Sequence, residues 1–149
     1  MKREIELYIH IPFCVKKCAY CDFLSSPADE AVKKAYVKAL ELEIAFWGQK
    51  LENTTVSTIF IGGGTPSLLS GEQMETLLQC VRRSFRVEKD AEITMEMNPG
   101  TVNDKNLIRY KKAGVNRISI GLQSAKNEEL QKLGRIHTFQ EFLDTYKAV

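Results

Sequence analysis

Three cysteines stand close together near the start of the chain, at Cys14, Cys18 and Cys21. Their spacing, C-x3-C-x2-C, lets one short loop supply three thiolates. A cubane iron–sulfur cluster contains four irons, and each iron is ordinarily held by one cysteine. Three cysteines therefore leave one iron free to bind a small molecule. This favours a reactive [4Fe–4S] site over simple electron storage.

Other uses of the three cysteines require further ligands or partner thiols. A structural zinc site is closed by four ligands, usually from two separated pairs. Cys80 lies far along the chain in a helical pattern and is expected to be a small buried residue. A disulfide framework needs even pairing and a secreted context, and no signal peptide is visible. A cluster is therefore favoured over zinc or a redox pair, and His10, on an expected strand, remains a candidate fourth ligand.

Composition sets bounds on the fold and on the partners. The chain has 149 residues, 44% hydrophobic content and a formal net charge of +2, which fits one compact domain or part of a larger protein. Lysine and arginine form no concentrated stripe, so no nucleic-acid partner is expected. No apolar run approaches membrane-spanning length, so no transmembrane segment is expected. Free cysteines and the lack of a targeting segment predict a cytoplasmic protein.

Hydrophobic periodicity predicts strands and helices in alternation. The expected strands cover residues 4–11, 56–61, 91–97 and 117–123. Three expected helices are marked by their starts: one at Ser26-Pro27, one at a capping box from Ser70 to Gln73, and one at a capping box from Thr138 to Glu141. Two more cover residues 104–113, ending at Gly114, and residues 128–133. In the helix after Pro27 the apolar stripe is Val32, Tyr36, Leu40, Ile44 and Trp47; in the helix after Ser70 it is Met74, Leu77, Leu78, Val81 and Phe85.

Four consecutive strand–helix units predict an α/β fold with a parallel sheet and right-handed crossovers. A doubly wound sheet and a (β/α) barrel both fit this order. The second face of several strands is polar, through Tyr8 and His10, Glu96 and Gln123. Closed barrels and doubly wound sheets are apolar there. The polar face favours a wider barrel, or partial barrel, with a lumen that holds a ligand.

Four groups of candidate residues lie at the carboxyl ends of the expected strands, which is where barrel active sites lie. The cysteine loop follows the first strand and Gly62-Gly63-Gly64 follows the second. Glu96 lies near the end of the third strand, and Gln123 ends the fourth. The chain stops at Val149 inside a helical pattern with no closing strand. We therefore expect an N-terminal portion of a longer protein.

Five motifs together carry a family resemblance: the cysteine spacing, Tyr8-Ile-His-Ile-Pro-Phe-Cys14, Gly62-Gly-Gly-Thr-Pro66, Glu96-Met-Asn-Pro99 and Ser119-Ile-Gly-Leu-Gln123. The sequence resembles the radical S-adenosylmethionine (SAM) superfamily from the first strand to the segment 133–137. Within that superfamily it is similar to the oxygen-independent coproporphyrinogen III oxidases and the HemW-type heme chaperones. The resemblance implies that residues 1–149 form the N-terminal part of a partial (β/α)6 barrel, with about four βα units and the rest of the barrel absent.

The resemblance also implies cofactors and partners. Cys14, Cys18 and Cys21 would hold a [4Fe–4S] cluster whose open iron binds the amine and carboxylate of SAM. One electron then cleaves SAM to methionine and a 5′-deoxyadenosyl radical, so the cofactor carries the reactive step. The implied partners are heme or a porphyrin, a flavodoxin-like or ferredoxin-like electron donor, and an unknown heme acceptor.

Site residues follow from the motif positions. By resemblance, Tyr8, Gly63 and Glu96 contact SAM, while the triplet Gly62, Gly63 and Gly64 lets the backbone approach the amino-acid end of the ligand. A further set corresponds to contacts with a second SAM in the oxidases: Tyr20, Gly64, Thr65, Gln123 and Arg135.

Two departures from the oxidase pattern favour the heme chaperone branch. The oxidases typically carry a further cysteine two residues after the third, where this chain has Phe23. They also have a longer segment before the tyrosine strand, and here only seven residues precede Tyr8. The expected function is binding and transfer of heme, with coproporphyrinogen oxidation as the alternative. A cluster-bearing segment with no activity of its own is a third reading, and His10 and His137 are candidate heme ligands by residue type alone.

Overall fold

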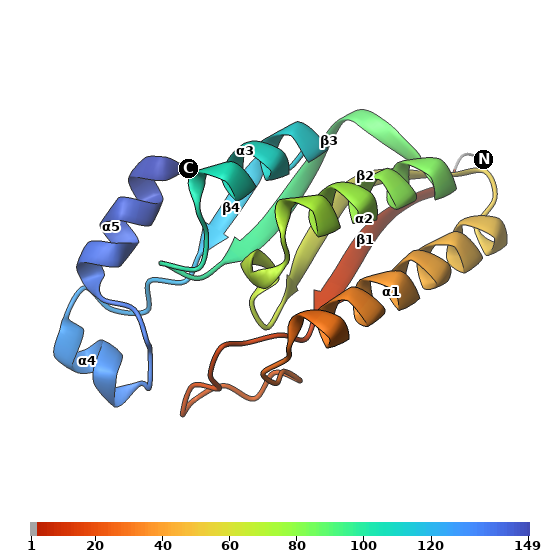
Figure 1. Cartoon of the computed structure of the whole chain (residues 1–149). Coiled ribbons are helices and arrows are strands. Elements are labelled where there is room, and N and C mark those ends of the chain that lie inside the picture. Colours follow the sequence, from red (N-terminus) through yellow and green to blue (C-terminus); the bar gives the residue numbers. More distant parts are fainter. Residues whose placement is uncertain (1–2) are drawn as a thin grey trace.

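The computed structural model describes residues 3–149 and contains one four-stranded parallel sheet (Figure 1). Its strands are β1 (Arg3–Ile11), β2 (Thr54–Gly63), β3 (Arg86–Met97) and β4 (Arg117–Ile120), in the spatial order β1-β2-β3-β4. Each strand therefore pairs with the next one in the chain, as in the wall of a (β/α) barrel. A doubly wound sheet would instead reverse its strand order at a switch point. The predicted α/β fold with a parallel sheet is confirmed.

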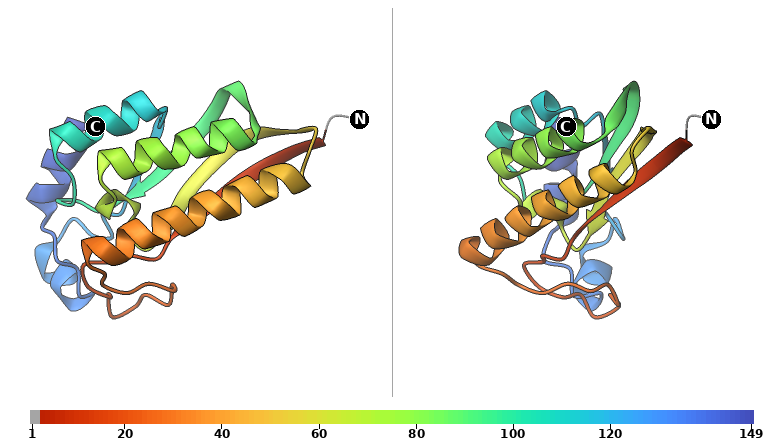
Figure 2. Two further views of the ribbon diagram at one scale, coloured as in Figure 1. Left: turned by 45° about the vertical axis from the view of Figure 1, so that its right-hand side comes forward. Right: turned by 90° about the vertical axis from the view of Figure 1, so that its right-hand side faces the viewer.

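The helices α1 (Glu30–Lys50), α2 (Gly71–Ser84) and α3 (Asp104–Ala113) cover one face of the sheet and leave the other face, within residues 3–149, without a covering helix (Figure 2). Of the three, α2 packs between the other two. A short 3-10 turn, η1 (Pro66–Leu68), precedes α2. The last two helices, α4 (Asn127–Lys132) and α5 (Phe139–Ala148), lie beyond the carboxyl ends of the strands.

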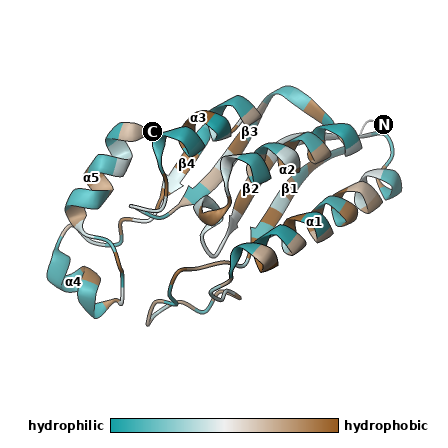
Figure 3. Cartoon of the chain, viewed as in Figure 1, coloured by the Kyte–Doolittle hydropathy of each residue, from teal (hydrophilic) through white to brown (hydrophobic). Residues whose placement is uncertain are grey.

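The core lies between the sheet and these three helices. Strand residues Ile11, Ile59, Ile61 and Met95 are at most 1% exposed. The helix ribbons alternate between hydrophilic and hydrophobic colours along their length, as amphipathic helices do (Figure 3). All five residues of the stripe predicted after Ser70 are buried: Met74, Leu77, Leu78, Val81 and Phe85. Burial of each such side chain contributes about 1.5–3 kcal/mol to folding, which fixes the position of α2 on the sheet.

Local end signals were predicted well at α2, α3 and α5. Ser70 and Thr138 each form a complete capping box. Gly114 follows α3 with a φ of +108°, a left-handed conformation that suits glycine.

The predicted start of the first helix at Ser26 is wrong. Asp29 is the N-cap of α1, and its carboxylate accepts a 2.8 Å hydrogen bond from the Val32 N–H. Ser26 is held in extended conformation instead, because its N–H donates to Pro12 O and its carbonyl accepts from Cys14 N–H. These bonds close the cysteine loop at its base.

Strand and stripe boundaries also differ from the predictions. β3 begins at Arg86, five residues before the predicted start, and β2 runs from Thr54 to Gly63. β4 ends at Ile120, three residues before the predicted end at Gln123, and Gln123 itself has a φ of +67° that an extended strand excludes. On α1 the fully buried positions are Val37 and Ile44, whereas Val32 and Trp47 at the ends of the predicted stripe are about half exposed.

Candidate functional site

A cleft of about 350 Å³ opens where the carboxyl ends of β2, β3 and β4 meet the cysteine loop. The strands end together in Figure 1, and the loop between β1 and α1 lies beside them. The structure brings nine of the twelve predicted site residues to this cleft: Cys14, Cys18, Cys21, Tyr20, Gly63, Gly64, Glu96, Gln123 and Arg135. Convergence from three strand ends and one loop is the arrangement expected of a barrel active site.

Three predicted residues do not line this cleft. Tyr8 lies on β1, where its ring stacks on Phe60 and its hydroxyl is 3.0 Å from His10 Nδ1. Burial, and secondarily the negative charge of Glu96, raise the pKa of the Tyr8 hydroxyl. Gly62 and Thr65 lie just behind the cleft wall, and Thr65 is buried.

The glycine triplet allows the ends of the strands to approach one another closely. The Gly63 N–H donates a 3.0 Å hydrogen bond to Glu96 Oε2, and Gly63 has a φ of +114°. A Cβ at Gly62 would lie 2.8 Å from the same carboxylate oxygen. A Cβ at Gly64 would lie 2.5 Å from the Phe13 carbonyl oxygen. The triplet thus holds the Glu96 carboxylate and the first turn of the cysteine loop.

The three cysteines are free thiols, partly exposed, and all three line the cleft. The loop turns between the last two, where the Cys21 N–H donates to Cys18 O at 3.2 Å. Within residues 3–149 no group of three or more His, Cys, Asp or Glu side chains is close enough together to hold a metal ion. The donor set, three thiols on one cleft, nevertheless suits a cluster with one open iron better than a closed four-ligand zinc site.

His10 does not supply a fourth ligand in this arrangement. Its Nε2 lies 3.0 Å from the Leu24 carbonyl oxygen, and its Nδ1 lies 3.0 Å from the Tyr8 hydroxyl. Both ring nitrogens are therefore engaged by protein atoms, and His10 supports the far end of the cysteine loop. Cys80 is buried, as predicted, and its thiol donates to Glu41 O within the helical layer.

Asn98 is a site residue that the sequence analysis did not single out. It lines the cleft directly after β3, and its side-chain oxygen accepts a 2.8 Å hydrogen bond from Arg135 Nη2. Its side-chain nitrogen donates to Thr65 Oγ1 at 2.9 Å. Asn98 belongs to the Glu96-Met-Asn-Pro99 motif, and that motif is the sequence signal that identifies it.

His137 lies behind the cleft, only 5% exposed. Its Nε2 is 3.2 Å from the Leu122 carbonyl oxygen, and its Nδ1 has no hydrogen-bond partner among residues 3–149. Burial, and then the positive charge of Arg135, lower the pKa of the imidazole. A neutral Nε2–H tautomer that donates to Leu122 O fits both observations.

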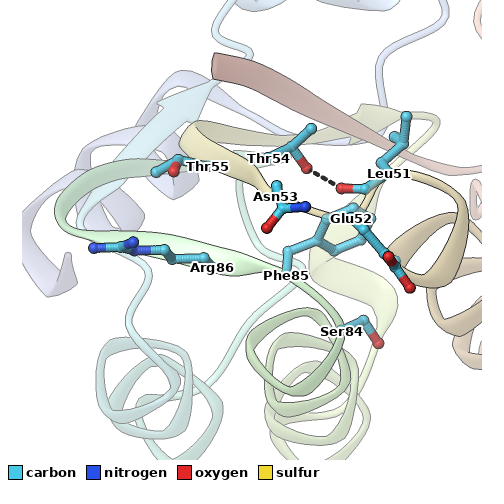
Figure 4. A pocket seen from close by; sticks show the side chains of 9 residues that line it. Leu51, Glu52, Asn53, Thr54, Thr55, Ser84, Phe85 and Arg86 are labelled. Atoms are coloured by element: carbon cyan, nitrogen blue, oxygen red, sulfur yellow. Dashed lines mark hydrogen bonds between the residues drawn. The ribbon is translucent and has the colours of Figure 1, made fainter. Parts of the chain in front are cut away.

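A further cavity, of about 300 Å³, lies at the opposite ends of the strands (Figure 4). It is formed by residues 51–55 before and at the start of β2 and residues 84–86 at the start of β3, and the Thr54 hydroxyl donates to Leu51 O there. No predicted site residue lies in it. Of the helices in residues 3–149, none is both long and apolar enough to cross a lipid bilayer.

Known protein sequences are similar to nearly the whole chain. The model of the radical SAM superfamily matches residues 8–149. The heme chaperone HemW of Escherichia coli is 52% identical over 143 residues, which is 92% of this chain and 36% of that protein. The heme chaperone HemW of Haemophilus influenzae is 41% identical over 142 residues, 92% of this chain and 37% of that protein. The chain thus spans little more than a third of these relatives.

A solved structure shows the same fold. The coproporphyrinogen III oxidase HemN of Escherichia coli, described as a radical SAM enzyme, superposes with a TM-score of 0.90 at 30% identity, over 99% of this chain and 34% of that one. The four strands and their helices therefore correspond to part of that enzyme's fold. The superfamily implies a [4Fe–4S] cluster and SAM as cofactors. On the sequence match and the fold together, the chain belongs to the radical SAM superfamily.

Proposed function

We propose that the chain is the N-terminal part of the radical SAM core of a heme chaperone, which binds a [4Fe–4S] cluster, SAM and heme and passes heme to an acceptor protein. The observation that carries the proposal is the composition of the cleft. It is lined by three cysteines and by Phe23, which stands where the oxidase branch typically has another cysteine. The higher identity to HemW proteins than to HemN supports the same assignment.

In this proposal Cys14, Cys18 and Cys21 hold the cluster. When bound, the cluster supplies one electron and an open iron position for SAM. A flavodoxin-like or ferredoxin-like protein is the proposed source of that electron. In support of this assignment, the three cysteines line the same cleft as Gly63 and Gly64.

The strand ends orient the amino-acid and ribose parts of SAM. Gly63 and Gly64 present backbone to the cleft without side chains, so a ligand can approach closely. Glu96 accepts hydrogen bonds from the ammonium group or the ribose hydroxyls, and the Gly63 N–H holds its carboxylate in place. Tyr8, whose ring stacks on Phe60 and whose hydroxyl pKa is raised by burial and then by the charge of Glu96, is proposed to contact SAM from β1.

A second group of residues surrounds the far side of the cleft. Tyr20, Gln123 and Arg135 line it, and Gln123 holds a left-handed φ of +67° directly after β4. A non-glycine residue in that region costs roughly 1–3 kcal/mol and often marks a functional site. We assign Tyr20 and Gln123, with Thr65 and Gly62 behind the cleft wall, to contacts with SAM or the heme-bearing partner.

Coproporphyrinogen III oxidation is the second candidate, because the chain superposes so closely on HemN. The two functions differ in a measurable product. A chaperone binds heme and releases it to an acceptor, whereas the oxidase decarboxylates coproporphyrinogen III.

The cluster is tested on the purified full-length protein, reconstituted with iron and sulfide without air. We expect about four irons per protein and a [4Fe–4S] electron paramagnetic resonance signal after reduction. Cys14→Ser, Cys18→Ser and Cys21→Ser should each lose iron, while Cys80→Ser, a substitution at the one cysteine outside the loop, should retain it. Unchanged iron in all three loop variants would refute the ligand assignment.

The heme function is tested on the same protein. We expect heme binding in the visible spectrum, transfer to apoprotein acceptors, and no release of carbon dioxide from coproporphyrinogen III. Decarboxylation at rates typical of an enzyme, without stable heme binding, would establish the oxidase function instead.

A further inference from the structure

Arg135 connects the cysteine loop to the strand ends. Its Nη2 donates to Asn98 Oδ1 at 2.8 Å and to the Gly121 carbonyl oxygen at 2.9 Å. Its Nη1 lies 3.5 Å from the Tyr20 hydroxyl and 3.8 Å from Cys18 Sγ, which is within the range of an N–H to sulfur hydrogen bond. One guanidinium thus links β3, the end of β4 and the cysteine loop.

The segment that carries Arg135 also docks on the same loop through its backbone. The Ala19 N–H donates to Leu133 O at 3.2 Å. Gly134 has a φ of +76°, and a Cβ there would lie 3.3 Å from the Ala19 nitrogen. The loop residue next to Cys18 therefore sits against residues 133–135, which positions the guanidinium beside the sulfur of Cys18.

A second path runs from the same arginine to the first cysteine. Asn98, which accepts from Arg135, donates to Thr65 Oγ1 at 2.9 Å. Thr65 Oγ1 is in turn 3.6 Å from Cys14 Sγ. Two of the three proposed cluster ligands are thus reached from one guanidinium, directly at Cys18 and through two side chains at Cys14.

From these contacts we infer that Arg135 is a positioning residue for the iron–sulfur cluster: it fixes the cysteine loop and places a positive charge beside the Cys18 sulfur, which makes the cluster easier to reduce. The inference rests on the proposed function, because it requires a cluster on these cysteines. Hydrogen bonds and positive charge at the ligand sulfurs stabilise the more negative, reduced cluster and so raise its reduction potential. The contact with Asn98 and Gly121 keeps the charge in place without involving SAM.

This role differs from the one implied by resemblance, in which Arg135 contacts a second SAM. Both terminal nitrogens of the guanidinium are already engaged by protein atoms. The remaining donor, Arg135 Nε, is buried and has no hydrogen-bond partner among residues 3–149. Arg135 and His137 line the same small cavity behind the cleft. An arginine held this way acts on the cluster through its ligand.

The test compares Arg135→Gln and Arg135→Lys with the wild type in the reconstituted full-length protein. Arg117→Gln is the matched control, because Arg117 lies on β4, pairs with Glu92 at 3.3 Å and is not a residue of the cleft. We expect the cluster of Arg135→Gln to be about tenfold harder to reduce, a shift of about 59 mV to more negative potential for one electron. Arg135→Lys should shift less, and Arg117→Gln should match the wild type.

Hydrogen exchange in the metal-free protein gives an independent readout. The amides of Cys14, Ala19 and Cys21 are hydrogen-bonded in the loop, and we expect them to exchange about tenfold faster in Arg135→Gln than in Arg117→Gln. If Arg135→Gln takes up no cluster, a negative shift in Arg135→Lys together with faster exchange still supports the inference. Equal potentials in wild type and Arg135→Gln would overturn it while leaving the proposed function intact. A wild-type protein that takes up no cluster would overturn the proposed function itself.

Discussion

The Gly63 N–H donates a 3.0 Å hydrogen bond to Glu96 Oε2, so the end of β2 orients the carboxylate at the end of β3. A carboxylate accepts several hydrogen bonds, and one bond from the protein leaves capacity for a ligand. The neighbouring Gly62 has no side chain, and a Cβ there would meet the same oxygen at 2.8 Å. Gly63 therefore orients the Glu96 carboxylate, and the missing side chain at Gly62 leaves room for it.

Gly62→Ala should weaken SAM binding by about tenfold or more, because the new methyl group displaces a carboxylate whose position sets the ligand contacts. The atoms it meets are the ends of side chains, Glu96 Oε2 and the Phe60 ring edge at 2.7 Å. These can move, so the free energy of unfolding should fall by less than about 1 kcal/mol. Calorimetric titration with SAM and denaturant unfolding measure the two effects.

Gly64→Ala is the matched control, because it adds the same methyl group at a neighbouring glycine that faces backbone and not the Glu96 carboxylate. Its Cβ would meet the Phe13 backbone at 2.5 Å, at the base of the cysteine loop. Backbone cannot rotate away, so we expect a loss of about 2 kcal/mol or more in the free energy of unfolding. Gly62→Ala protein that binds SAM as the wild type does would show that the Glu96 position is unimportant.

The parts of the fold that local chemistry dictates were predictable. The stripe on α2 and the capping boxes at Ser70 and Thr138 depend on residues three or four apart, and all were confirmed. Ser26-Pro27 carries the same kind of local signal but does not begin a helix. There a bridge between Phe13 and Ser26 outweighs it, and only the folded loop brings those residues together.

Asp29→Ala should therefore destabilise the protein, and Ser26→Ala should not. The Asp29 carboxylate caps the Val32 N–H at 2.8 Å, and loss of such a cap costs about 1 kcal/mol. The bonds of Ser26 to Pro12 and Cys14 use its backbone, which alanine retains. Thermal or denaturant unfolding of the two variants separates the alternatives. A larger loss of stability in Ser26→Ala than in Asp29→Ala would indicate that Ser26, and not Asp29, caps the helix.

The side-chain contacts of the site were less predictable than its members. The cysteine loop, the glycine triplet, Glu96 and Gln123 could be named because they stand at strand ends, which converge in a barrel. Tyr20 and Arg135 could be named only from the family resemblance. The bond from Arg135 to Asn98 joins residues 37 positions apart, and the bond from Arg135 to Cys18 joins residues 117 apart. Hydrophobic periodicity relates only residues a few positions apart and cannot predict such long-range contacts. Tyr8 shows the converse, since its motif is conspicuous but its side chain contacts Phe60 and His10 and is not among the residues that line the cleft.

Tyr110→Phe should lower the free energy of unfolding by about 1–3 kcal/mol, since it leaves a buried carbonyl without its donor. The Tyr110 hydroxyl donates to Leu69 O at 2.5 Å and joins α3 to the turn before α2. Burial raises the pKa of this hydroxyl to about 12. Tyr146→Phe, at a residue 65% exposed, is the control and should change stability little. Equal effects in the two variants would contradict the role of the buried bond.

His137 predicts how stability depends on pH. Its pKa is lowered in the folded protein by burial and by the charge of Arg135, whereas the unfolded chain has the ordinary value of about 6.5. The unfolded state therefore binds a proton first as the pH falls. The contribution of His137 to the free energy of unfolding is full above about pH 6.5 and declines below it, until the folded protein is protonated as well.

His137→Gln removes this titration, and its amide can still donate to the Leu122 carbonyl that His137 Nε2 approaches at 3.2 Å. We expect the wild type to lose more stability than His137→Gln between about pH 7 and about pH 5, so that the gap between the two narrows on acidification. Denaturant unfolding across that range measures the gap. A gap that stays constant would mean that His137 has the same proton affinity folded and unfolded. The protein around His137 would then stabilise the charged imidazole as well as water does, although His137 is only 5% exposed and lies beside Arg135.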